Sequence, residues 1–252
     1  MNTITEIIAY LKSNRDELGI TLELSAHAEL INQVEETYNI KLPDDIRTFY
    51  EFANGFESDD FMFRIIPLEE MVENRRTYNY NELCIAEYMI YSDTWNLIID
   101  QEDNKYRIVN GNHSDEKIVT LTNSLADFLQ RFIDGGLLGK NGLYYWYNEL
   151  IINRITKSSD KLVATFKLEG TFHITGRGLV ISGQIIQGKL LKGDIFWFEE
   201  DGYKTVIDIE SIEFGHSGKN SFVGLMLGKH ISKETERSIK NLTGSPINIY
   251  RF

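Results

Sequence analysis

Few residues of this 252-residue chain belong to the types that carry out catalysis or bind metals. The single cysteine, Cys84, lies between Leu83 and Ile85, which predicts a buried, inert thiol. A nucleophilic role for it would need a histidine nearby in space. No two histidines are four residues apart, the spacing that places two metal ligands on one helix face. We therefore expect no catalytic site, no metal and no cofactor. The histidines are His27, His113, His173, His216 and His230.

Acidic residues, in contrast, occur in clusters. Residues 100–104 offer oxygen ligands like those of a calcium loop, but they lack the glycine and the terminal glutamate of an EF-hand. We interpret this segment as a hairpin turn. Nothing in the sequence indicates a glycosidase cleft, so the clusters are interpreted as a charged surface for a protein partner. They are Glu57-Asp59-Asp60, Glu69-Glu70-Glu73, Asp100-Glu102-Asp103 and Asp115-Glu116.

A glycine-rich string at residues 134–141 has some features of a phosphate-binding loop. It lacks the first glycine and the final serine or threonine of that motif, and it follows a predicted helix instead of a strand. We therefore expect no nucleotide site. No stretch approaches the roughly 18 apolar residues that a membrane span needs, and the first residues have no signal-peptide pattern. With only one cysteine as well, we expect a cytoplasmic protein.

The net charge of −12 is distributed unevenly. Residues 1–156 hold 13 Lys and Arg against 27 Asp and Glu, a net charge of −14, whereas residues 157–252 hold 13 against 11, a net charge of +2. General nucleic-acid binding is disfavoured, because it requires a basic face. The acidic half has two open interpretations. It could speed the encounter with a cationic partner, or it could be a solvated surface that only aids solubility.

The first half of the chain combines helical and strand patterns, which predicts an α+β domain. Helical spacing of apolar residues begins near Thr3, near Ser25 and at Pro43, and Asn54-Gly55 supplies a stop signal for the third helix. Residues 61–66 then predict a strand and 68–78 a helix. Further strands are predicted at 83–87, 95–100, 106–109 and 117–121, and a last helix follows Ser124.

Residues 38–55, YNIKLPDDIRTFYEFANG, resemble the signature of the SUKH superfamily, in which a Leu-Pro pair opens a helix that ends in Asn-Gly. Residues 66–71, 97–100 and 124–129 match later family segments in the same order, and the resemblance covers about residues 15–135. It implies a binding role. Many SUKH proteins are immunity proteins that neutralise bacterial toxins, often nucleases or deaminases, and others are eukaryotic regulators linked to cell-wall synthesis.

The second half alternates strand-like runs with glycine turns, which predicts a small, closed all-β barrel. Residues 172–194, including Gly176-Arg177-Gly178 and Gly193-Asp194, resemble the second domain of translational GTPases such as elongation factor Tu. Residues 204–214 and 223–227 continue that resemblance, which covers about 162–252. The nucleotide site of that family lies in a preceding domain, so the resemblance implies no GTPase activity here.

These patterns predict two domains. Residues 1–138 form the SUKH-like α+β domain, 139–156 an aromatic and partly helical connector, and 157–252 the β-barrel. The connector contains the run of residues 144–147, YYWY. Such aromatics could stack on nucleic-acid bases, but no basic cluster accompanies them. We favour packing between the domains.

We therefore expect a non-enzymatic immunity protein whose acidic domain binds and neutralises a cognate protein toxin. The alternative is a cellular scaffold or regulator whose barrel binds a translation component or a tRNA end. A third possibility is that the barrel mimics an elongation-factor surface that the toxin recognises. The oligomeric state stays open. The expected partner-binding residues are aromatics and flanking acids: Phe56, Glu57, Asp59, Asp60, Glu87, Tyr88, Tyr91, Asp93 and Trp95.

Overall fold

The computed structural model describes residues 3–75, 82–100, 102–111, 118–157, 161–217, 220–227 and 231–251. Two compact units make up the chain, Met1–Tyr147 and Asn148–Phe252, so the division falls inside the helix α6 (Leu143–Thr156). Within the described ranges, no helix has the length and apolar character needed to cross a membrane.

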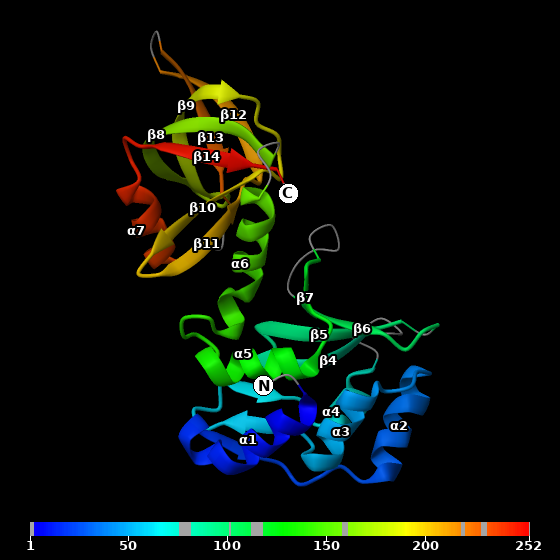
Figure 1. Ribbon diagram of the computed structural model, residues 1–252. Coiled ribbons are helices and arrows are strands. Elements are labelled where there is room, and N and C mark those ends of the chain that lie inside the picture. Colours follow the sequence, from blue (N-terminus) through cyan, green and yellow to red (C-terminus); the bar gives the residue numbers. More distant parts are fainter. Residues whose placement is uncertain are drawn as a thin grey trace. The chain divides into compact units, whose positions relative to one another are not determined.

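The first unit combines helices with one antiparallel sheet (Figure 1), which is consistent with the predicted α+β domain. Each strand pairs with the next along the chain. The helices are α1 (Ile4–Leu18), α2 (Ala28–Tyr38), α3 (Asp44–Phe52), α4 (Leu68–Glu73) and α5 (Leu125–Gly135). The strands are β1 (Ile20–Leu22), β2 (Phe56–Ser58), β3 (Phe63–Ile65), β4 (Glu82–Tyr88), β5 (Asp93–Ile99), β6 (Tyr106–Asn110) and β7 (Thr120–Thr122).

Local capping signals place the ends of these helices. The backbone N–H of Glu6 donates to the Thr3 hydroxyl, and the Thr3 N–H donates back to the Glu6 carboxylate at 3.2 Å, which is a capping box at the start of α1. Ser124 caps α5 by accepting the N–H of Asp127. Both sequence predictions of a helix start are confirmed.

The Asn54-Gly55 pair joins α3 to the sheet and also fixes α4. The Asn54 side-chain oxygen accepts the Leu68 N–H at 3.0 Å, and its amide donates to Glu69 at 2.6 Å, so Asn54 holds the first turn of α4. Gly55 has φ +99°, and a Cβ there would lie 2.3 Å from the carbonyl oxygen of Ile65. Only glycine fits at this close approach.

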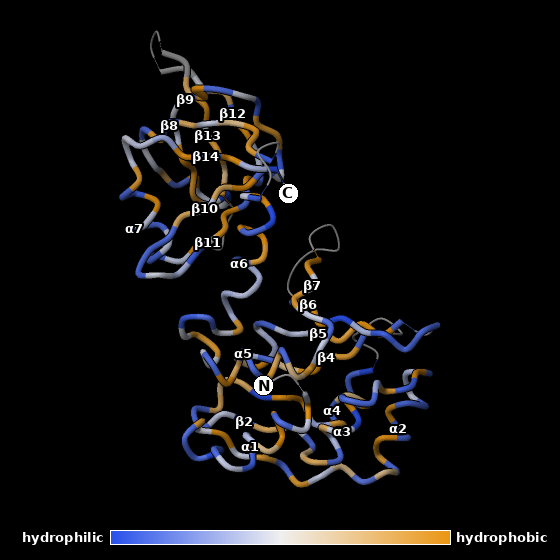
Figure 2. The backbone as a smooth tube through the Cα atoms, viewed as in Figure 1, coloured by the Kyte–Doolittle hydropathy of each residue, from blue (hydrophilic) through white to orange (hydrophobic). Residues whose placement is uncertain are grey.

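An aromatic cluster forms much of the core of this unit. Phe63 stacks on Phe132 with ring centroids 4.9 Å apart and packs edge-on against Trp95 at 5.7 Å. Trp95 also meets Phe128, and Phe56 meets Phe132. The sheet and α5 are therefore held together by interlocked aromatic rings. Figure 2 shows hydrophobic residues recurring along α5 and along the strands of both units.

The observed strands differ from the prediction in one informative place. The strand predicted over residues 61–66 is a short strand, β3, and it is preceded by a loop and by β2. Strands β1 and β2 were not predicted, because three-residue strands are too short to show an alternating pattern. Helix α4 ends at Glu73, before the predicted end at residue 78, which lies outside the described ranges.

The aromatic residues at the start of α6 pack on the first unit. Tyr144 meets Tyr88 edge-on at 6.3 Å, and the guanidinium of Arg131 lies 4.9 Å from the centre of the Trp146 ring. Tyr147 is buried. These contacts occupy the rings and do not favour a platform for nucleic-acid bases.

The second unit is built mainly of antiparallel strands, in the order β11-β10-β14-β8-β9-β13-β12. In the described residues β11 and β12 are the two edges of this sheet, so the predicted closed barrel is not confirmed. The helix α7 was not predicted, because it is strongly polar. The elements are β8 (Leu162–Ile174), β9 (Gly178–Gly188), β10 (Ile195–Glu200), β11 (Tyr203–Asp208), β12 (Ser211–Ser217), β13 (Asn220–Met226), α7 (Lys233–Asn241) and β14 (Pro246–Tyr250).

Candidate protein-binding surface

Two loops of the first unit lie side by side at the ends of neighbouring hairpins. Residues 59–62 join β2 to β3, and residues 89–92 join β4 to β5. Phe63 pairs with Tyr88 in the sheet, and just beyond that pair the Met89 N–H donates to the Met62 carbonyl at 2.8 Å. This hydrogen bond continues the sheet pairing into the two loops.

Large apolar side chains project from both loops into solvent. Phe61 is 78% exposed and Ile90 is 90% exposed, and Met62 and Met89 are 39% and 46% exposed. We call these four residues the loop-tip patch. Single exposed apolar residues are common on protein surfaces, whereas a group of them on adjoining loops is typical of an interaction site.

The backbone at the loop-tip patch adopts a conformation that side chains disfavour. Phe61, Met89, Ile90 and Tyr91 all have positive φ, between 49° and 61°. A left-handed conformation costs about 1–2 kcal/mol for an ordinary residue, and a β-branched residue such as Ile90 rarely adopts it. Three consecutive residues of this kind need contacts elsewhere that hold the turn in place.

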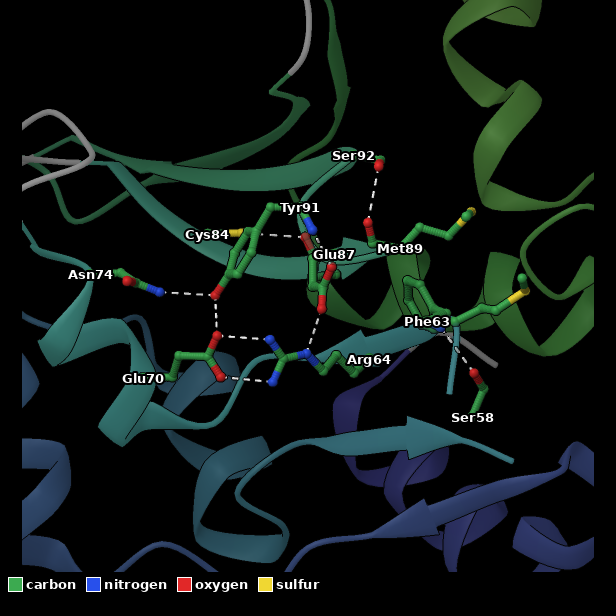
Figure 3. A network of polar contacts seen from close by, with 12 residues as sticks. Ser58, Phe63, Arg64, Glu70, Asn74, Cys84, Glu87, Met89, Tyr91 and Ser92 are labelled. Carbon is green, nitrogen blue, oxygen red and sulfur yellow. Dashed lines mark hydrogen bonds and ion pairs between the residues drawn. The ribbon is translucent and has the colours of Figure 1, made fainter. Parts of the chain in front are cut away.

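A network of charged and polar side chains beneath the turn supplies these contacts (Figure 3). Both terminal nitrogens of Arg64 donate to Glu70 at 2.7 Å, and its Nε donates to Glu87 at 2.5 Å. The other oxygen of Glu87 accepts the Tyr91 N–H at 2.6 Å. The Tyr91 hydroxyl donates to Glu70 and accepts from Asn74. The last residue of the left-handed turn is therefore held through both its backbone and its side chain.

Glu70 stays charged over the physiological pH range. Partial burial opposes ionisation of Glu70, but hydrogen bonds from Arg64 and Tyr91 lower its pKa below the ordinary value. Burial and the hydrogen bond to Glu70 raise the pKa of Tyr91, so this hydroxyl keeps its proton. The ion pair between Arg64 and Glu87 is the better shielded from water, since the Glu87 side chain is 6% exposed and the Glu70 side chain 22%.

The structure separates the nine residues expected to bind a partner into four groups, of which the fourth, Phe56 and Trp95, belongs to the core. Asp59 and Asp60 are exposed in the first loop, and Glu57 is half-buried beside them. Tyr91 and Glu87 belong to the supporting network. The half-buried residues Tyr88 and Asp93 flank the second loop.

Phe56 and Trp95 require a correction. They are 1% and 0% exposed and belong to the aromatic core, so neither presents a surface to a partner. Their aromatic character reflects packing, because each lies on the buried face of a strand. The exposed apolar residues of the loop-tip patch were missed instead. The sequence pattern predicted a strand for Phe61-Met62, which hid their exposure. Met89-Ile90 is an apolar pair between two predicted strands, and this apolar pair in a turn could have indicated an exposed patch.

The described residues contain no group of three or more His, Cys, Asp or Glu side chains that could hold a metal ion. Cys84 is buried, and its thiol donates to the carbonyl of Ala86 at 3.4 Å. His173 pairs with Glu236 at 3.0 Å on the surface of the second unit. His113, His230 and the acidic pair Asp115-Glu116 lie outside the described residues.

Comparison with curated proteins gives no match to this chain. Comparison with family models gives a match to part of it. The match to a family model covers residues 25–131, which include both loops, the loop-tip patch and the network beneath it. These residues are similar to the SMI1 / KNR4 family (SUKH-1), the superfamily that the signature at residues 38–55 resembles.

Proposed function

We propose that this chain is a non-catalytic immunity protein, and that its acidic first unit binds and neutralises a cognate toxin through the loop-tip patch. The SUKH-1 match is consistent with an immunity role in general. The observation that carries the proposal is the group of four exposed apolar residues on two braced loops. The partner is a basic protein domain, of the nuclease or deaminase type.

The patch has the arrangement of a protein–protein hot spot. Apolar side chains occupy its centre, and the exposed acids Asp59 and Asp60 lie at its edge. Such sites derive most of their affinity from a few central side chains, whereas the charged rim guides the partner and selects it. The Arg64 network holds the loop of residues 89–92 before binding, so less conformational entropy is lost when the partner docks.

A growth-rescue assay tests this proposal. The full chain is used to capture its partner from the native cell, and the partner is then expressed alone and with each variant. The expected partner is toxic alone, and the wild-type chain restores growth. The double variant Phe61→Asp, Ile90→Asp should fail to restore it and bind at least about 30-fold more weakly, because it places charge in the hot spot.

Leu24→Asp is the matched control. Leu24 is 89% exposed in the same unit but lies outside both loops, so this variant should rescue growth like the wild type. Equal rescue by the double variant would rule out the loop-tip patch as the binding site. A captured partner without toxicity would contradict the immunity function itself.

A further inference from the structure

Both exposed methionines that the structure describes belong to the loop-tip patch. Met62 is 39% exposed and Met89 is 46% exposed. The hydrogen bond from the Met89 N–H to the Met62 carbonyl holds the two residues on adjoining loops. In Figure 3 the Met89 side chain extends away from the network around Arg64. Two thioethers are therefore presented to solvent together, beside Phe61 and Ile90.

The other sulfur atoms in the described part of the chain are inside the protein. Met71, on α4, and Met226, on β13, are both 3% exposed. The thiol of Cys84 is buried. Met1 lies outside the described residues. An oxidant in solution therefore reaches the thioethers of the patch before any other described sulfur, because oxidation of sulfur depends on access.

We propose that Met62 and Met89 form an oxidation site, at which conversion of the thioethers to sulfoxides by a peroxide weakens binding of the partner. The proposal rests on the proposed function, and it adds a means of regulating the same surface. A thioether is apolar and adapts its shape to a partner, whereas a sulfoxide carries a hydrogen-bond acceptor. Burial of this oxygen in the apolar centre of an interface leaves the acceptor without a donor, which opposes binding.

The oxidation transfers one oxygen atom from hydrogen peroxide to sulfur. A lone pair of the sulfur attacks one peroxide oxygen, so an S–O bond forms and the O–O bond breaks. The departing hydroxide takes the proton of the transferred oxygen and leaves as water. Sulfur loses two electrons and peroxide gains them. Methionine sulfoxide reductases reverse the step, because two thiols supply the electrons, form a disulfide and release the oxygen as water.

The support of the two loops does not depend on these thioethers. The loops are held by the backbone of Met62 and Met89 and by the network that joins Arg64, Glu87 and Tyr91. Oxidation therefore changes the polarity of the patch and leaves its support in place. This differs from general oxidative damage, in which a buried methionine is oxidised and the core is disrupted.

The first measurement locates the oxidised residues and needs no partner. The full chain is treated with a limiting amount of hydrogen peroxide, and the added oxygen is located by peptide mass spectrometry. Met62 and Met89 should be oxidised at least about tenfold faster than Met71 and Met226, because reactivity follows exposure. The midpoint of urea unfolding should stay unchanged at that stage. Similar rates at all four methionines, or a loss of stability, would overturn the proposal.

The second measurement follows binding of the partner captured in the growth-rescue assay. Oxidised wild type should bind about tenfold or more weakly than untreated wild type, and methionine sulfoxide reductases should restore the affinity. Met62→Leu, Met89→Leu replaces both thioethers by apolar side chains of similar volume that peroxide does not oxidise. Whatever its affinity before treatment, this variant should keep that affinity after treatment.

Met71→Leu, Met226→Leu is the matched control. It also lacks two methionines but retains those of the patch, so peroxide should weaken its binding as much as that of wild type. Equal sensitivity of the two double variants would assign the loss of binding to another residue and overturn the oxidation site.

The outcomes separate this proposal from the proposed function. A captured partner without toxicity would contradict the immunity function, and its binding would still report the effect of oxidation. If Phe61→Asp, Ile90→Asp loses rescue but oxidised wild type binds normally, the patch stands and the oxidation site is overturned. If that variant rescues growth and peroxide leaves binding unchanged, both proposals fail.

Discussion

Ile90 combines two properties that a residue rarely has together. It is almost fully exposed, so it gains little from burial, and it adopts a left-handed conformation with φ 54°. A stability argument alone would place glycine or asparagine there. Under the proposed function, the branched apolar side chain at this position serves to bind the partner.

Replacement of Ile90 separates these two effects. Ile90→Gly should be more stable than Ile90→Ala by about 1 kcal/mol, because glycine adopts positive φ without steric cost. Both variants should lose partner affinity to a similar extent, since both remove the apolar side chain. Urea unfolding and a binding titration measure the two quantities. If alanine is as stable as glycine, the turn is not strained.

At the scale of elements, the network under the β4–β5 turn connects α4, β3 and β4. Arg64 comes from β3, Glu70 from α4 and Glu87 from β4, so one guanidinium links three elements and the turn that follows them. This linkage predicts how the unit responds to acid. The folded-state pKa of Glu70 is depressed, so its contribution to stability is present above the ordinary pKa of about 4.5 and is lost as the pH falls through the lower folded-state value.

Glu70→Gln tests this linkage. The wild type should lose stability below about pH 4.5 more steeply than the variant, because the variant has no carboxylate to protonate. Urea unfolding midpoints between pH 2.5 and pH 7 measure the difference. Parallel curves for the two proteins would show that the ion pair between Arg64 and Glu70 contributes no pH dependence.

The sequence predicts those elements whose ends carry explicit signals. Thr3 with Glu6 and Ser124 with Asp127 fixed two helix starts, and both are observed. The short strands β1 and β2 carry no such signal. Helix α7 does begin at a capping serine, Ser232, but it was missed because its residues are mostly polar. The acidic part of the candidate site was predicted, because charge is visible in sequence. The apolar part was not, because the exposure of Phe61 and Ile90 depends on loop conformation.

At the scale of the whole molecule, the charge is concentrated in the unit that carries the patch. Residues 1–156 have a net charge of −14 and the remainder +2. An acidic binding face raises the rate of encounter with a basic partner, and salt screens this effect. Electrostatics should therefore act mainly on association, and the apolar patch mainly on dissociation.

Charge reversal at Glu57, Asp59 and Asp60 tests this division. Replacing all three with lysine should slow association at low salt by about tenfold or more, and the difference from wild type should shrink as salt is raised. Stopped-flow measurement with the captured partner gives the rates. The matched control reverses Glu199, Asp201 and Glu210, which are exposed in the second unit. Equal slowing in the control would assign the effect to net charge alone.

The bracing of the two loops does not depend on the side chains at their tips. Met89 is held through its backbone N–H, and so is Tyr91, whose N–H bonds to Glu87. Side chains at the four patch positions can therefore be replaced without loss of the hydrogen bonds that hold the two loops. A library randomised only at Phe61, Met62, Met89 and Ile90 should retain the fold and yield variants that recognise new targets. The first unit is therefore a starting point for binders of new specificity.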